Sequence, residues 1–171
     1  AGVRLSGNIV AGEGKIVLLA EFATQSDIAN NPVSYDADYG HLNGMWTLEN
    51  GLSLGLAYET LGGGTAPGMM FRTPLATLHA FQGWADMFLT TPTAGIDDVF
   101  ATVKYKVGGW NLTGVYHDFS SEVGSADYGT EFDLSAGTKI SKNYGVLFKG
   151  AFFSSDSVSY PDTNKFWIMF T

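Results

Sequence analysis

The chain has 171 residues and a formal net charge of −8, which argues against a nucleic-acid partner because phosphates would repel it. It contains no cysteine, so a disulfide framework, a thiolate metal site and a cysteine nucleophile are excluded. Hydrophobic residues make up 45% of the chain, yet the longest apolar run, residues 16–20, is far shorter than the roughly 18 residues of a membrane-spanning helix. A membrane location would therefore require strands that form a closed barrel.

Nine segments alternate apolar and polar residues with a period of two, which predicts strands with two different faces. At a rise of ~3.3 Å per residue and a tilt of ~40°, ten residues cover about 25 Å, the height of the lipid-facing band of a barrel. In chain order the predicted strands are 2–10, 15–24, 38–49, 52–61, 97–107, 110–120, 129–141, 144–155 and 163–170.

The connections between these strands alternate strictly between short and long. The short turns, at 12–14, 50–51, 108–109 and 142–143, contain Gly and Asn, which supply the positive φ angles of tight hairpins. The long connections are 25–37, 62–96, 121–128 and 156–162. Outer-membrane barrels sort their loops in this way, with short periplasmic turns and long external loops. The pattern predicts an all-β, antiparallel up-and-down transmembrane β-barrel in the bacterial outer membrane, with residues 1–171 as a single barrel segment.

The predicted number of strands is odd, whereas bacterial single-chain barrels have an even number and keep both termini in the periplasm. If the last strand ends on the periplasmic side, strand 2–10 begins on the external side. We therefore expect a segment of a larger barrel, whose remaining strands come from upstream or from other barrel subunits.

Aromatic residues lie at both ends of the predicted apolar face, as in the two interfacial belts of a membrane barrel. Those near the short turns are Trp46, Tyr105, Trp110 and Tyr144, and those near the long loops are Tyr58, Tyr116 and Phe152. The lipid-facing positions between the belts include Leu54, Leu56, Val103, Leu134, Ala136, Val146 and Phe148. This arrangement predicts contact with outer-membrane lipid and lipopolysaccharide, and the aromatic core of a soluble sandwich is the alternative.

The long connection 62–96 is the segment in which a helix is expected. Apolar residues recur there at helical spacing, Thr73 is a suitable cap and Pro74 suits a first helical turn. An apolar external helix must cover its apolar side, either in the barrel lumen or on a neighbouring subunit. We expect the lumen, with Arg72, His79 and Asp86 near the constriction.

Four segments resemble bacterial outer-membrane proteins of the alginate-export type. They are residues 21–27 (EFATQSD), 71–86 (FRTPLATLHAFQGWAD), 115–119 (VYHDF) and 126–131 (ADYGTE). The resemblance runs from about residue 20 to Trp167, and segment 71–86 is its most specific part. It implies an outer-membrane location and a porin-like role.

The function of such a channel would depend on the side chains that line its lumen. The predicted pore-lining residues are Arg4, Lys15, Glu21, Glu49, Glu59, Lys104, Lys106, Glu131, Asp133, Lys139, Lys149 and Lys165. The other acids, Asp97 and Asp98 among them, are expected in loops or at strand ends. Seven cations against five acids predict diffusion of small polar or weakly anionic solutes. Charges that only pair across strands, in a plugged barrel without flux, are the alternative.

We expect no catalytic residue, no cofactor and no metal site. Asp36, Asp38 and the acid pair 97–98 offer oxygen ligands, but they lack the spacing of a calcium loop. His117 and Asp118 are adjacent in a predicted strand and so face opposite sides, and no Gly-x-Ser-x-Gly motif is present. A hydrolase at the external rim, using Ser120 or Ser154, is the enzymatic alternative.

Overall fold

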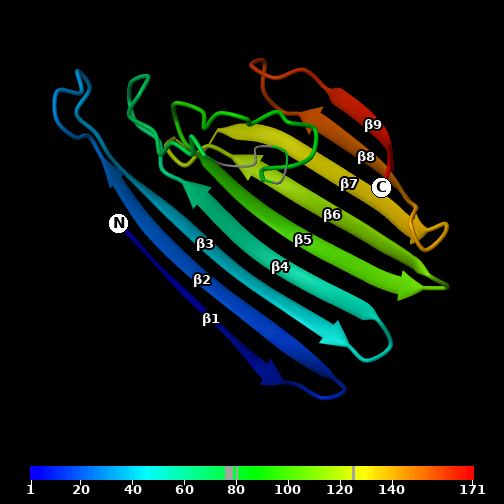
Figure 1. Cartoon of the computed structure of the whole chain (residues 1–171). Coiled ribbons are helices and arrows are strands. Elements are labelled where there is room, and N and C mark those ends of the chain that lie inside the picture. The colour runs from blue at the N-terminus through cyan, green and yellow to red at the C-terminus, as the bar shows by residue number, and fades with distance from the viewer. Residues whose placement is uncertain (76–78, 80, 125) are drawn as a thin grey trace.

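The computed structural model describes residues 1–75, 79, 81–124 and 126–171, which fold into one antiparallel sheet of nine strands (Figure 1). Each strand pairs with the next along the chain, so the predicted all-β, up-and-down topology is confirmed. The strands are β1 (Gly2–Val10), β2 (Gly14–Ser26), β3 (Asp36–Leu48), β4 (Leu52–Leu61), β5 (Ile96–Val107), β6 (Trp110–Ser120), β7 (Asp127–Lys139), β8 (Gly145–Ser155) and β9 (Thr163–Phe170). Four of them have the predicted boundaries, and the others differ by one or two residues at one end or at both.

The connections are sorted by length, with the long ones at one end of the sheet and the short ones at the other (Figure 1). Gly12, Gly51, Gly108 and Gly109 have positive φ angles in the short turns, as predicted. Asn143 does not have a positive φ angle, so the prediction is wrong there. It is also wrong for Asn50. Its side chain instead accepts a hydrogen bond from the Leu52 amide at 3.0 Å, so it stabilises the turn as an Asx turn.

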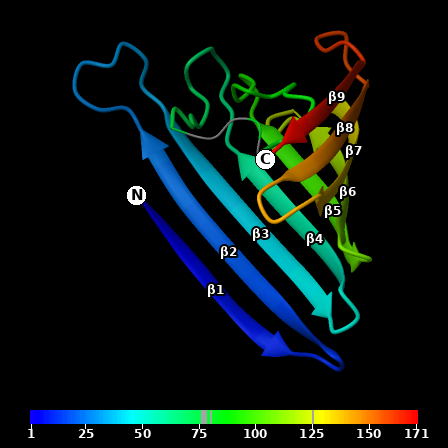
Figure 2. The same ribbon diagram turned by 45° about the vertical axis from the view of Figure 1, so that its right-hand side comes forward.

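The sheet is curved and open (Figures 1 and 2). In the part of the chain that the structure describes, β1 pairs with β2 and β9 with β8, and these two edge strands do not pair with each other. None of the described residues forms a helix long and apolar enough to cross a membrane.

The described residues of the long connection, now bounded as 62–95, lie mostly in turns, bends and irregular structure, and the predicted helix is absent from them. Residues 76–78 and 80, which belonged to that prediction, lie outside the described part. Gln82, Gly83 and Asp86 have φ angles of 51°, 80° and 60°, which are left-handed and interrupt a right-handed helix. The amides of Trp84 and Ala85 bond to strand carboxylates instead of to helical carbonyls.

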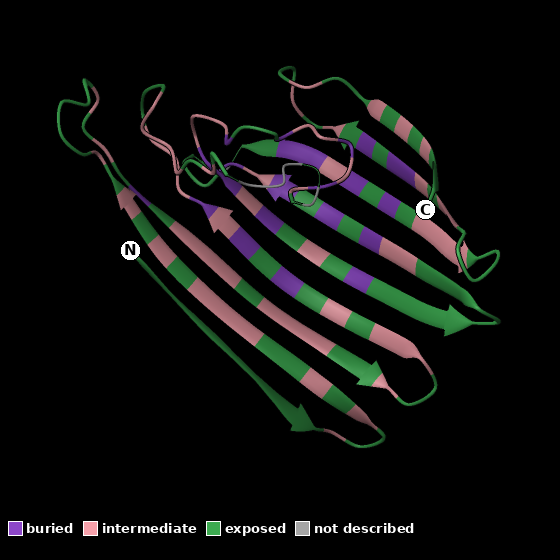
Figure 3. Ribbon diagram, viewed as in Figure 1, coloured by how far each residue is buried: buried purple, intermediate pink, exposed green. Residues whose placement is uncertain are grey.

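The apolar spacing in this connection serves packing against the sheet. Ala85 and Phe88 are buried, and Phe88 contacts the rings of Phe119 and Tyr128 with centroids 4.8 and 5.6 Å away. Leu75, in contrast, is almost fully exposed. The buried residues gather on β4–β8 at the long-loop end of the sheet (Figure 3). The core of the molecule thus lies between one face of the sheet and the connection 62–95.

Candidate functional site

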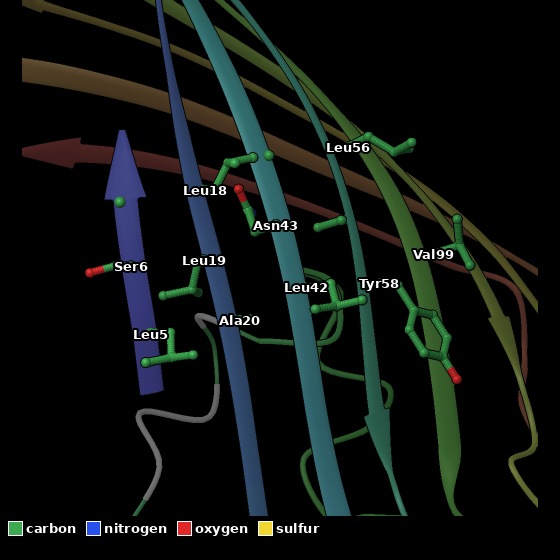
Figure 4. A pocket seen from close by; sticks show the side chains of 13 residues that line it. Leu5, Ser6, Leu18, Leu19, Ala20, Leu42, Asn43, Leu56, Tyr58 and Val99 are labelled. Atoms are coloured by element: carbon green, nitrogen blue, oxygen red, sulfur yellow. The ribbon is translucent and has the colours of Figure 1, made fainter. Parts of the chain in front are cut away.

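One face of the sheet, here called the apolar face, presents hydrophobic side chains to the surroundings along all nine strands. In β5 its members run from Val99 to Val107, a length of about 26 Å along the strand at ~3.3 Å per residue. Leu42 and Leu56, near the middle, are 58% and 65% exposed. An open hollow of about 700 Å³ on this face is lined by side chains from β1 to β5, among them Leu5, Leu18 and Val99 (Figure 4).

Polar atoms border the apolar face at both ends of the strands. At the short-turn end, the indole N–H of Trp46 donates to the carbonyl of Ala11 at 3.3 Å. At the long-loop end, the Tyr58 hydroxyl donates to the Asp97 carboxylate at 2.9 Å. Each aromatic ring therefore lies on the apolar band and directs its polar atom away from the middle of the band. Aromatic residues with this orientation are typical of membrane–water interfaces.

The opposite face, here called the polar face, carries the predicted pore-lining residues. Paired residues of an antiparallel sheet project to the same side, so the register decides which residues share a face. The members of the predicted set on this face are Arg4, Lys15, Glu21, Glu59, Lys104, Lys106, Glu131, Asp133, Lys139, Lys149 and Lys165. Glu49 does not belong to it, because it lies in the turn after β3.

Charge is distributed unevenly along the polar face. Lys15, Lys104, Lys106 and Lys139 lie towards the short turns and are exposed. Glu59, Glu131 and Asp133 lie towards the long loops and are at most 4% exposed. Asp98 joins them: it is the third residue of β5, at a strand end as predicted, and its side chain is buried. The composition gave no sign of this separation, because it depends on how far along each strand a residue lies.

The connection 62–95 covers the buried carboxylates. The Trp84 amide donates to Asp133 Oδ2 at 3.1 Å, and the Ala85 amide donates to Glu131 Oε1 at 2.7 Å. Two successive amides after left-handed residues form a concave anion site, and here the anions belong to β7. Glu131 Oε2 and Asp133 Oδ1 are buried and have no partner among the described residues.

A second set of contacts attaches this connection to β8 and β9. Asp86 accepts hydrogen bonds from His79 Nδ1 at 2.7 Å and from Lys165 Nζ at 2.9 Å. Lys149 lies 2.9 Å from His79 Nε2 and 4.0 Å from the centre of the Trp84 ring. Partial burial raises the pKa of Asp86, but the bonds from Lys165 and His79 outweigh it, so this pKa lies below its usual value.

The structure brings together two of the three predicted constriction residues, His79 and Asp86. Arg72 lies elsewhere: its amide donates to Gln25 Oε1 at 2.8 Å and its carbonyl accepts from Gln25 Nε2 at 3.1 Å. Its guanidinium lies 5.9 Å from the centre of the Tyr35 ring. Arg72 therefore fixes the start of the connection to β2.

His117 takes part in a carboxylate network that the sequence did not indicate. Its Nδ1 lies 2.9 Å from Asp98 on β5, and its Nε2 lies 3.8 Å from Asp133 on β7. Both partners are distant in sequence, so only the register of β5, β6 and β7 places them beside His117. The hydrogen-bonding partner of this histidine is a carboxylate and not a serine.

In the described ranges, no three His, Asp or Glu side chains gather as ligands for an ion. Compared with known proteins, the chain matches no family model, no curated protein and no solved structure.

Proposed function

We propose that this chain forms part of the wall of a β-barrel channel in a bacterial outer membrane, which passes small polar or weakly anionic solutes by diffusion. The observation that carries the proposal is that the sheet exposes its apolar face and buries acids on its polar face. Its hydrophobic residues face outward along all nine strands, whereas Glu131 and Asp133 are buried on the other side. A soluble sheet would bury the apolar face, and lipid would cover it in a barrel.

The open edges of the sheet fit a larger wall. A strand in hydrocarbon must have all its backbone groups paired, so the outer edges of β1 and β9 require further strands.

Acids on the polar face argue against a polyanion such as alginate as the solute. The exposed lysines near the short turns favour weak anion preference instead.

The second candidate is a barrel whose lumen is plugged and carries no flux. The connection 62–95 favours it, since this segment is attached to β4, β7 and β9 through Gln82, Ala85 and Asp86. Such contacts would close the part of the lumen beside these strands.

Single-channel recording in planar lipid bilayers separates the two candidates. The protein purified from outer membranes is expected to give stepwise currents with a modest preference for chloride over potassium. Insertion without current would favour the plugged barrel. A protein that stays monodisperse in buffer without detergent and fails to insert would contradict both.

A further inference from the structure

A small pocket lies between the connection 62–95 and strands β2 to β5, and it is here called the loop pocket. Its volume is about 230 Å³, below the roughly 300–1,000 Å³ of sites for drug-sized ligands, so it suits a single ring with a short tail. Its apolar wall consists of Leu61, Phe71, Phe81, Phe88, Leu89 and Ile96.

The charged groups of the loop pocket are two carboxylates, Glu21 and Glu59. Glu21 faces Arg4 at 3.6 Å, whereas no cation of the described residues pairs with Glu59. Glu59 is 4% exposed. It accepts hydrogen bonds from the Tyr39 hydroxyl at 2.8 Å and from the side-chain amide of Gln82 at 2.5 Å. Both donors are neutral, so no positively charged group hydrogen-bonds to this buried carboxylate, and the residue opposite it on β3 is His41.

Gln82 belongs to a connection and Tyr39 to a strand, so a ligand would displace the Gln82 side chain with less disturbance of the sheet. The φ angle of Gln82, 51°, is a left-handed conformation that side-chain-bearing residues rarely adopt. Tyr39, in contrast, lies within β3 and stacks on Phe71 with the ring centres 5.6 Å apart. A ligand that replaced the Gln82 amide would leave the bond from Tyr39 in place.

We propose that the loop pocket binds a small amine with one hydrophobic ring, whose ammonium group bonds to Glu59 and whose ring packs between Phe71 and Phe88. The ammonium supplies the cation that Glu59 lacks, and the ring fills the apolar wall. A carboxylate of the same size would meet Glu21 and Glu59 and be repelled. A sugar could pair with Thr73 and Thr91, but it would also place hydroxyl groups against the phenylalanine and leucine side chains of the apolar wall. The proposal goes beyond the channel, because binding does not require that the barrel conducts.

Isothermal titration calorimetry of the detergent-solubilised protein tests the proposal with three probes of similar size. Phenethylamine is cationic, phenethyl alcohol is its neutral counterpart, and phenylacetate is anionic. We expect the amine to bind about tenfold more tightly than the alcohol, and phenylacetate to show no binding. Equal affinities for all three would indicate detergent partitioning and overturn the proposal, as would the absence of binding by any probe.

Two variants locate the site. Glu59→Gln keeps an acceptor for Tyr39 but removes the charge, so the amine should lose its tenfold advantage while the alcohol binds as before. Leu89→Trp should fill the pocket and abolish binding of both. Glu13→Gln, in the turn between β1 and β2, is the matched control and should leave all affinities unchanged. Retained preference for the amine in Glu59→Gln would assign the binding to another site.

Discussion

Asp133 and Leu134 are neighbours in β7 with opposite surroundings. The Asp133 side chain is fully buried under the connection 62–95, and Leu134 is 44% exposed on the apolar face. In a soluble sheet the leucine would lie inside and the aspartate in water. The same inversion holds in β4 for Leu56, which is 65% exposed, and Glu59, which is 4% exposed. Residue by residue, the exposed face of these strands is apolar and the covered face carries acids, which is the arrangement that the proposed membrane wall requires.

Arginine at position 134 tests which face contacts lipid. In the proposed barrel, Leu134→Arg is expected to lower the free energy of unfolding by roughly 2–4 kcal/mol, because the charge would enter hydrocarbon near mid-depth. Ser135→Arg, one residue along β7 on the polar face, is the matched control and should have a small effect. Urea unfolding of the protein in lipid bilayers measures both. Equal losses for the two variants would invalidate the assignment of faces.

Asp86 should make the attachment of the connection 62–95 to β9 sensitive to acid. Its pKa is lowered in the folded state, so the stabilisation is complete above the ordinary value of 3.8 and is lost as the pH falls through the lowered pKa. The fluorescence of Trp84 and Trp167, which flank Lys149, should change in this range. Asp86→Asn should lack that part of the transition. Superimposable titration curves for the two proteins would contradict the role of Asp86.

At the scale of elements, the conformation of the connection 62–95 depends on Gly83. Its φ angle is 80°, and a Cβ atom there would lie 2.6 Å from the carboxylate of Glu131. The residue therefore serves two purposes, since it permits a left-handed turn and lets the backbone approach β7 closely. The amides that follow it can then reach the two carboxylates of β7.

Gly83→Ala should loosen this connection without disturbing the strands. Backbone strain of about 1–3 kcal/mol adds to the clash with Glu131, so cleavage of the connection by chymotrypsin should accelerate at least about tenfold. Gly124→Ala is the control, because Gly124 also has a positive φ angle, 87°, but open space around it. If both variants showed the same protection as the parent protein, the contact with Glu131 would not determine how the connection is held.

Strands and connections differed in how well the sequence predicted them, and the reason is the range of the interactions. The alternation in β4 and β6 is a local property, so both strands begin and end where the sequence indicated. The helix predicted around Ala85 and Phe88 failed because the amides of that segment bond to β7, some 46 residues away. The pair formed by His117 and Asp98 was missed for the same reason, since it requires the register between β5 and β6.

At the scale of the whole molecule, the polar face divides into two zones along the strands. Exposed lysines occupy the short-turn half, and buried carboxylates under the connection 62–95 occupy the other. In the proposed channel, a solute that moved along the polar face would meet the covered, acidic zone and the open, basic zone in succession. The covering segment would then limit the passage more than the lysines do, because it occupies volume as well as presenting charge.

Deletion of residues 70–90 tests whether this segment limits the passage. Each of the nine strands pairs with its sequence neighbour, and none of these pairs involves the deleted residues, so the proposed barrel should still insert. With the cover removed, single-channel conductance should rise several-fold. Glu131 and Asp133 would lose the hydrogen bonds from the deleted amides and become open to water. Cation selectivity should therefore increase together with conductance. If conductance were unchanged and an oligomer were lost instead, the segment would lie at a contact between subunits. A segment that does not narrow the passage would then contact a neighbouring subunit.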